Sequence, residues 1–245
     1  GGENVATPQR AAENADFVCC CVGNDDDLKS VAFGENGILN GLKTGSTFID
    51  HTTASADVAR EINLKVNGLS AHFLDAPVSG GELGAQNGVL TIMVGGKESN
   101  FIKAKPLMDC YAKAVTLMGS SGSGQLCKMV NQICIAGLVQ GLSEGMAFGK
   151  KAGLDMNKVI EVISKGAAQS WQMDNRASTM IEDQFDFGFA VDWMRKDLGI
   201  ALEEAKRNGV DMPMVKMVDD FYAEVQSNGG GRLDTSSLLT RYTRN

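Results

Sequence analysis

The stretch from Met118 to Gln132 most constrains how this chain can fold, because it joins two parts of very different pattern. It runs from a short apolar segment through the glycine-rich turn Gly119–Gly124 into a long helical segment. Before it, short apolar runs alternate with helical patterns, and after it almost every segment has helical periodicity. We therefore expect an α/β domain over residues 1–119 and an all-helical domain over residues 120–245.

Five short apolar runs predict strands in the first part. The first run has no charged residue between Phe17 and Val22, which is typical of a strand buried on both faces of a parallel sheet. Helices between the strands imply right-handed crossovers and a mostly parallel sheet covered by helices. The predicted strands are Asp16–Val22, Ser46–Asp50, Ala71–Asp75, Leu90–Val94 and Ala114–Met118, and the predicted helices are Gln9–Asn14 (opened by Thr7-Pro8), Asp27–Phe33, Ser55–Asn67 (with Ser55 as its cap) and Ser99–Tyr111.

The second part predicts helices only. The longest covers residues 122–153 and would extend roughly 45 Å at about 1.5 Å per residue. Its apolar residues lie on nearly all sides, which indicates a central helix surrounded by other helices or by a second subunit. Further helices are predicted near residues 155–164, 173–182, 192–208 and 212–226, with a short last one from Ser236.

Charge and cysteine usage exclude several classes of partner and site. The net charge of −7, without a long basic run, argues against nucleic acid and anionic membranes. The six cysteines form no C-x-x-C pair, so we expect small buried side chains in a reducing compartment and a cytoplasmic protein. Two histidines, His51 and His72, are too few and too scattered for a zinc site, and we expect no metal.

Three loops are the first candidates for a ligand site. In open α/β sheets, ligands bind beyond the carboxyl ends of the strands. The loops that leave such ends here are Val22–Asn24, Asp50–Thr53 and Asp75–Gly81, and all are rich in glycine and small polar residues.

The turn Gly119–Gly124 allows two interpretations. It lies between a strand and a helix, as a dinucleotide fingerprint does, but Cys127 occupies the place of the third glycine of G-x-G-x-x-G. No acidic residue ends a strand about 20 residues later, as ribose recognition requires. The turn is therefore a corner where the backbone approaches a ligand, or simply a tight connection from strand to helix.

Two other features carry candidate chemistry. Ser79-Gly80-Gly81 offers a hydroxyl and open backbone N–H groups, which suit a carboxylate, although a plain polar turn has the same composition. No histidine or acid is spaced to activate Ser79 as a nucleophile. Lys128 lies on an otherwise apolar helix, where burial would lower its pKa toward the range of proton exchange; a lysine on a solvent-exposed face is the alternative.

Three motifs point to one family. They are Asp75–Gly81, followed by Ala85–Gly88 and Leu90–Gly96; Gly122-x-Gly124-x-x-x-Lys128-x-x-Asn131; and Arg195–Leu198. In this order, and over essentially the whole chain, the sequence resembles the β-hydroxyacid dehydrogenase family, which contains 3-hydroxyisobutyrate dehydrogenase and tartronate semialdehyde reductase. The resemblance implies a Rossmann-type NAD(P)-binding domain over residues 1–119 and a helical substrate and dimerisation domain over residues 120–245.

The resemblance also assigns substrate roles. In the family, the loop that matches Ser79, Gly80 and Gly81 holds the substrate carboxylate, and the lysine that matches Lys128 is the general acid and base. An asparagine one turn after this lysine positions the substrate. Gln132 occupies that place here and Asn131 comes one residue earlier, so Asn131 is the first choice and Gln132 its rival.

The implied cofactor is NAD or NADP. In the family it is contacted by residues that match Val22, Gly23, Thr53 and Lys196. The family's first βαβ unit, which carries G-x-G-x-x-G and selects between NAD and NADP, is absent from this sequence. We expect roughly 30 or more residues before Gly1, or else a truncated chain that binds the cofactor weakly because the pyrophosphate has no helix N-terminus.

The resemblance implies hydride transfer between the nicotinamide and a small 3-hydroxy acid, foremost oxidation of 3-hydroxyisobutyrate to methylmalonate semialdehyde. The alternatives are a tartronate semialdehyde (2-hydroxy-3-oxopropionate) reductase or another semialdehyde or imine reductase of the family. A catalytically inactive dimeric binding module is an alternative of another class. The expected partners are a small carboxylate substrate and further copies of the chain, in a dimer or tetramer formed through the helical domain.

Overall fold

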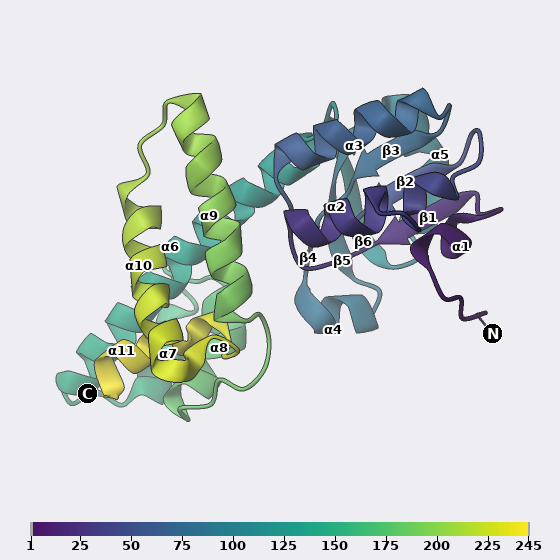
Figure 1. Ribbon diagram of the computed structural model, residues 1–245. Helices are drawn as coiled ribbons and strands as arrows, with labels where there is room; N and C mark the ends of the chain where they lie inside the picture. The colour runs from purple at the N-terminus through teal and green to yellow at the C-terminus, as the bar shows by residue number, and fades with distance from the viewer. Residues whose placement is uncertain (1, 245) are drawn as a thin grey trace. The chain divides into compact units, whose positions relative to one another are not determined.

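The computed structural model describes residues 2–244 (Figure 1). Its contacts divide the chain into two compact units, with the boundary between Lys128 and Met129. The first unit is α/β with a mostly parallel sheet and the second is helical, so the predicted fold class is confirmed. The start of the long helix belongs to the first unit, and the functional boundary at Gly119 stays a prediction.

The sheet of the first unit has the strand order β1-β2-β3-β5-β4, with β6 paired to β5. Strands β1, β2 and β3 are parallel, and their last residues Cys20, Asp50 and Asp75 are register partners. The three carboxyl ends therefore lie side by side. The strands are β1 (Phe17–Cys20), β2 (Thr47–Asp50), β3 (His72–Asp75), β4 (Val78–Ser79), β5 (Leu90–Gly96) and β6 (Ala112–Gly119).

Strand β5 departs from the predicted crossover pattern, because it runs antiparallel to both β3 and β4. The loop predicted over Asp75–Gly81 contains the two-residue strand β4, and the helix α4 (Gly81–Gln86) follows it before β5. Six helical residues span only about 9 Å, at about 1.5 Å each, which is too short for a helix to cross the sheet and return the chain in parallel.

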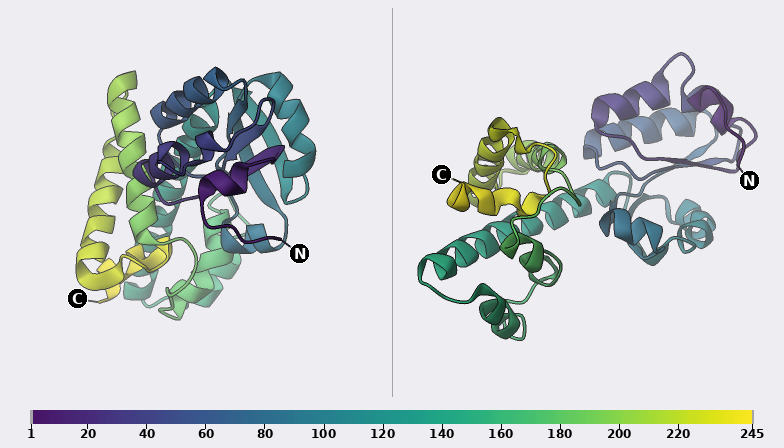
Figure 2. Two further views of the ribbon diagram at one scale, coloured as in Figure 1. Left: turned by 45° about the vertical axis from the view of Figure 1, so that its right-hand side comes forward. Right: turned by 90° about the horizontal axis from the view of Figure 1, so that it is seen from below.

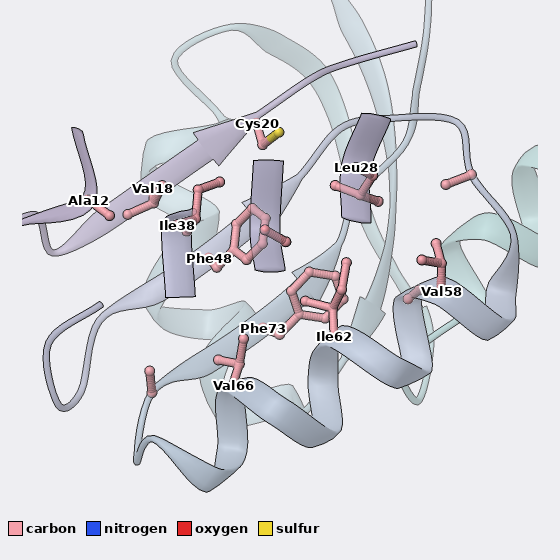
Figure 3. Close-up of a cluster of buried hydrophobic side chains, with 14 residues drawn as sticks. Ala12, Val18, Cys20, Leu28, Ile38, Phe48, Val58, Ile62, Val66 and Phe73 are labelled. Carbon is pink, nitrogen blue, oxygen red and sulfur yellow. The ribbon is translucent and has the colours of Figure 1, made fainter. Parts of the chain in front are cut away.

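Helices α2 (Asp25–Phe33) and α3 (Ala56–Gly68) cover one face of the parallel strands. Figure 3 shows Val58, Ile62 and Val66 of α3 pointing toward Phe48 and Phe73 of the sheet. Ser55 caps α3 as predicted, since its hydroxyl accepts a hydrogen bond of 3.1 Å from the backbone of Val58. The remaining helices of this unit are α1 (Pro8–Ala12), the 3₁₀ turn η1 (Ile38–Asn40) and α5 (Glu98–Met108).

The prediction that the cysteines are buried is wrong for most of them. Only Cys20 is buried, whereas Cys127 is half-buried and Cys19, Cys21, Cys110 and Cys134 are exposed. Strand β1 alternates, with Val18 and Cys20 in the core and Phe17 and Cys19 facing the other way. Such alternation is typical of a strand covered on one face only, so the apolar run Phe17–Val22 did not indicate burial on both faces.

The second unit consists of helices that pack along α6 (Ser123–Lys151), which begins in the first unit. One core cluster joins Ala136 and Val139 of α6 to the helices α9 and α10, which lie side by side in Figures 1 and 2. A second cluster joins Leu142 and Met146 to α8. The other elements are α7 (Met156–Ile163), α8 (Trp171–Ile181), α9 (Val191–Asn208), α10 (Pro213–Val225), the π-helical turn η2 (Gln226–Gly230), the 3₁₀ turn η3 (Thr235–Leu239) and α11 (Thr240–Thr243).

Helices of the second unit cover α6 on part of its surface only, whereas the sequence predicted a helix surrounded by other helices or by a second subunit. Its residues Val130, Leu138 and Phe148 are exposed, and Phe148 exposes 74% of its surface. Within residues 2–244, no helix combines the length and the apolar character that a bilayer span requires.

Candidate active site

The predicted site residues Val22, Gly23 and Thr53 lie on two loops that contact each other at the carboxyl edge of the sheet. The hydroxyl oxygen of the buried Thr52 accepts a hydrogen bond of 3.0 Å from the backbone of Val22. The backbone N–H of Thr52 donates to the Oδ1 atom of Asp50 at 3.1 Å. Thr52 therefore fixes the loop after β2 to the loop after β1, and the half-buried Thr53 follows directly.

Asp50 lies fully buried beneath these loops. Burial raises the pKa of its carboxyl to about 7, against the opposing effect of the hydrogen bonds with Thr52. Among the described residues, its Oδ2 atom has no hydrogen-bond partner. A neutral carboxylic acid is the form that such an environment favours, because desolvation penalises the charged form.

Asp75, at the end of β3, holds the start of α6. Its Oδ1 atom accepts a hydrogen bond of 2.8 Å from the backbone of Gly122, and its Oδ2 atom accepts one of 3.1 Å from the backbone of Gln125. These N–H groups have no partner within the helix, and a carboxylate there also faces the positive end of the helix dipole. Burial raises the pKa of Asp75, while the N–H groups of Gly122 and Gln125 counteract the shift.

The glycines of the turn before α6 allow this close packing. A Cβ atom at Gly124 would collide with the carbonyl oxygens of Met93 and Asp75, and one at Gly95 on β5 would lie 2.5 Å from the Asp75 carboxylate. Gly122 has a φ of 91°, a conformation that favours glycine. The glycines of the turn Gly119–Gly124 therefore bring the backbone of α6 close to the sheet. One interpretation of the sequence was that they bring the backbone close to a ligand.

Lys128 lies one turn after Gln125 on α6 and is 6% exposed. Ser79 belongs to the same unit, at the end of β4, and is half-buried. The following Gly80 and Gly81 are exposed and have φ angles of 130° and 62°, which side-chain-bearing residues rarely adopt. The backbone of this predicted carboxylate loop is therefore open to solvent.

The other three predicted residues lie in the second unit, where hydrogen bonds connect them through Asp197. The Nδ2 atom of Asn131 donates to the Oε1 atom of Gln132 at 2.8 Å, and the Nε2 atom of Gln132 donates to the Oδ2 atom of Asp197 at 2.6 Å. Lys196 forms an ion pair of 3.1 Å with the Oδ1 atom of Asp197. The structure thus groups Asn131, Gln132 and Lys196 around one buried carboxylate.

Five residues of this arrangement were not assigned a role from the sequence. Asp50 and Asp75 are acidic residues that end apolar strands, and this position is a signal that could have singled them out. Asp197 belongs to the motif Arg195–Leu198, and the sequence gave no chemical reason to single out Asp197 within this motif. Thr52 and Gln125 carry no comparable signal, because the bond from Val22 to Thr52 and the bonds of Gln125 join residues that are distant in sequence.

Two family models together match nearly the whole chain. One, described as the NAD binding domain of 6-phosphogluconate dehydrogenase, matches residues 1–119. The other, described as NAD-binding of NADP-dependent 3-hydroxyisobutyrate dehydrogenase, matches residues 122–242.

Individual proteins agree with these models. An uncharacterized oxidoreductase from Shewanella frigidimarina is 61% identical over 98% of this chain and 83% of its own length. The 2-hydroxy-3-oxopropionate reductase of Escherichia coli is 36% identical over 98% of this chain and 82% of its own length. A crystal structure of 3-hydroxyisobutyrate dehydrogenase from Salmonella typhimurium has a TM-score of 0.87 at 28% identity, covering 96% of this chain and 82% of that one.

Proposed function

The chain belongs to the β-hydroxyacid dehydrogenase family of NAD(P)-dependent oxidoreductases, and we propose that it acts on a small 3-hydroxy acid, foremost 3-hydroxyisobutyrate, which it oxidises to methylmalonate semialdehyde. Similarity to a 3-hydroxyisobutyrate dehydrogenase of known structure supports this substrate. Similarity to the E. coli reductase supports the alternative, in which 2-hydroxy-3-oxopropionate or another semialdehyde is reduced.

The carboxyl edge of the sheet fits a nicotinamide cofactor. Val22 offers an apolar surface, Gly23 has no side chain, and Thr53 adds a hydroxyl, all half-buried on loops that Thr52 holds together. These features suit a flat aromatic ring with a carboxamide. When bound there, the cofactor supplies or accepts the hydride. Lys196, ion-paired with Asp197, would contribute a positive charge to cofactor binding.

Lys128 would carry the proton in the proposed mechanism. In oxidation, its Nζ atom accepts the proton of the substrate hydroxyl while the hydride leaves the carbon that bears this hydroxyl. In reduction, it protonates the developing alkoxide. Such general acid and base catalysis accelerates a reaction about 10²–10⁴-fold.

Ser79, Gly80 and Gly81 would hold the substrate carboxylate. The hydroxyl and the open backbone N–H groups can donate to both carboxylate oxygens, which orients the carbinol carbon. Asn131, a residue of the second unit, would help to position the substrate, with Gln132 as the alternative. Both amides donate within the protein, but Asn131 is half-buried whereas Gln132 is 2% exposed, and this difference favours Asn131 as the substrate contact.

One observation carries the proposal: Asp75, at the end of β3, anchors the first turn of α6. This anchor fixes the turn that leads to the buried Lys128 against the sheet. We further propose a homo-oligomer formed through the helical unit, supported by exposed apolar side chains such as Phe148. A cytoplasmic location stays a prediction.

A substrate screen of the full-length protein tests the function. 3-Hydroxyisobutyrate, glycerate and related short 3-hydroxy acids are each assayed with NAD and with NADP, and Lys128→Ala serves as the matched control. We expect the highest kcat/KM with 3-hydroxyisobutyrate and no comparable rate in the control. A preference for glycerate would favour the reductase, and no turnover of any compound would favour an inactive binding module.

A further inference from the structure

We propose that Gln125 is a positioning residue: its side-chain amide clamps the loop that carries Thr53 and ties this loop to the helical turn that precedes Lys128. The inference rests on the proposed function, since Thr53 and Lys128 are its cofactor-binding and catalytic residues. It adds a residue that links the two.

The clamp consists of two hydrogen bonds to the backbone on either side of Thr53. The Nε2 atom of Gln125 donates to the carbonyl oxygen of Thr52 at 2.8 Å, and its Oε1 atom accepts from the backbone N–H of Ala54 at 3.0 Å. Gln125 is fully buried, as are Thr52 and Ala54. Buried backbone groups need hydrogen-bond partners, and this loop has left the sheet that would otherwise supply them.

The same residue is fixed to the sheet through its own backbone. The N–H group of Gln125 donates to the Asp75 carboxylate at 3.1 Å, beside the bond from Gly122. The loop after β2, the end of β3 and the first turn of α6 therefore meet at one residue, Gln125. Through Thr52 and its bond to Val22, the connection extends to the loop after β1.

Lys128 follows Gln125 by three residues, so both side chains lie on one face of α6 about 4.5 Å apart along the axis. Because a helical turn is rigid, a change in how Gln125 holds its loop changes the separation of Thr53 and Lys128. Hydride transfer requires reacting atoms within about 3–3.5 Å, and a misplacement of about 1 Å can cost 10²-fold in rate. The clamp should therefore affect kcat more than substrate affinity.

Glutamine suits this task because its amide offers a donor and an acceptor on one uncharged group, whatever the pH. Gln125→Glu keeps the shape and the bond from Ala54, and in its ionised form, at high pH, it turns an acceptor toward the carbonyl oxygen of Thr52. Gln125→Met keeps the approximate volume and removes both bonds. Gln140→Met is the matched control, since Gln140 is another buried glutamine of α6, bonded to Tyr242 in the second unit.

The experiment measures kcat, KM and melting temperature for these variants of the full-length protein. It also measures the dissociation constants of the dinucleotide and of ADP-ribose (or its 2′-phosphate, if NADP is the cofactor), which lacks the nicotinamide. For both Gln125 variants we expect kcat to fall about 10- to 100-fold with little change in the KM of the hydroxy acid. We also expect weaker dinucleotide binding and unchanged ADP-ribose binding, whereas Gln140→Met should lower only the melting temperature.

Two results would overturn the clamp. One is a kcat and a dinucleotide affinity that match those of Gln140→Met. The other is the failure of both Gln125 variants to fold while Gln140→Met folds, which would assign Gln125 a purely structural role. If the wild type turned over no 3-hydroxy acid, the proposed function would fail, but the contrast between dinucleotide and ADP-ribose binding would still decide on the clamp.

Discussion

The carboxylate of Asp75 accepts a hydrogen bond of 2.8 Å from the backbone N–H of Gly122, which joins the end of β3 to the start of α6. A strand residue thus acts as the N-terminal cap of a helix that begins 48 positions later, at Ser123. Capping from another element fixes the helix to the sheet as well as satisfying its first N–H groups.

Replacing Asp75 by alanine should therefore affect both stability and turnover. Two buried N–H groups lose their partner, so we expect the free energy of unfolding to fall by about 1–3 kcal/mol. We also expect a lower kcat, because the turn that leads to Lys128 is released. Urea unfolding and steady-state kinetics measure the two effects.

Asp155→Ala provides the control for this prediction. Asp155 caps α7 in the second unit by accepting hydrogen bonds from Asn157 and Lys158. Its loss should cost about 1 kcal/mol and leave kcat unchanged. Equal effects of the two substitutions on kcat would show that the Asp75 cap has no special relation to catalysis.

Asp50 should make the stability of the protein depend on pH. The pKa of its carboxyl is about 7 in the folded state, above the value of about 3.9 in an unfolded chain. The folded state therefore holds this proton more tightly. The stability that the proton provides is fully present below about pH 4 and is lost as the pH rises through about 7.

Asp50→Asn removes this dependence while keeping an oxygen for the Thr52 backbone. We expect the variant to gain stability relative to the wild type as the pH rises from 5 to 8, by roughly 2–3 kcal/mol. Urea unfolding at several pH values measures the difference, and a difference that does not vary with pH would contradict a protonated Asp50.

Lys196→Met should raise the dissociation constant of the cofactor. Loss of the ammonium group removes a positive charge that is ion-paired with Asp197 beside Gln132. Lys206→Met is the control, because Lys206 lies on the exposed surface of α9, the helix that also carries Lys196. This substitution should leave the dissociation constant of the cofactor unchanged. Cofactor titration by fluorescence decides the matter, and an unchanged constant for the Lys196 variant would refute its role.

The sequence predicted those parts of the fold that depend on local patterns. Alternating apolar runs and helices indicated the parallel strands, and Ser55 was identified as a cap because its position before an amphipathic helix is a local signal. Parallel strands also imply that the loops after Val22 and Asp50 leave the same edge. The cap of Asp75 and the clamp of Gln125 could not be predicted, because each joins residues that only the folded chain brings together.

Other differences have equally physical reasons. Strand β4 has two residues and α4 has six, and segments so short leave no periodic pattern. Three adjacent cysteines indicated burial, but a strand with one covered face buries only every second residue. The grouping of Asn131, Gln132 and Lys196 depends on Asp197, which the sequence marked as part of a motif without revealing its partners.

The proton-transfer role of Lys128 is tested most directly by the kcat of Lys128→Ala, measured with saturating 3-hydroxy acid and cofactor on the full-length protein. We predict a fall of at least about 10²-fold, since general acid and base catalysis accelerates a reaction roughly 10²–10⁴-fold, while the cofactor dissociation constant stays that of the wild type. A variant that keeps more than about a hundredth of the wild-type kcat would contradict the assignment of Lys128 as the catalytic acid and base.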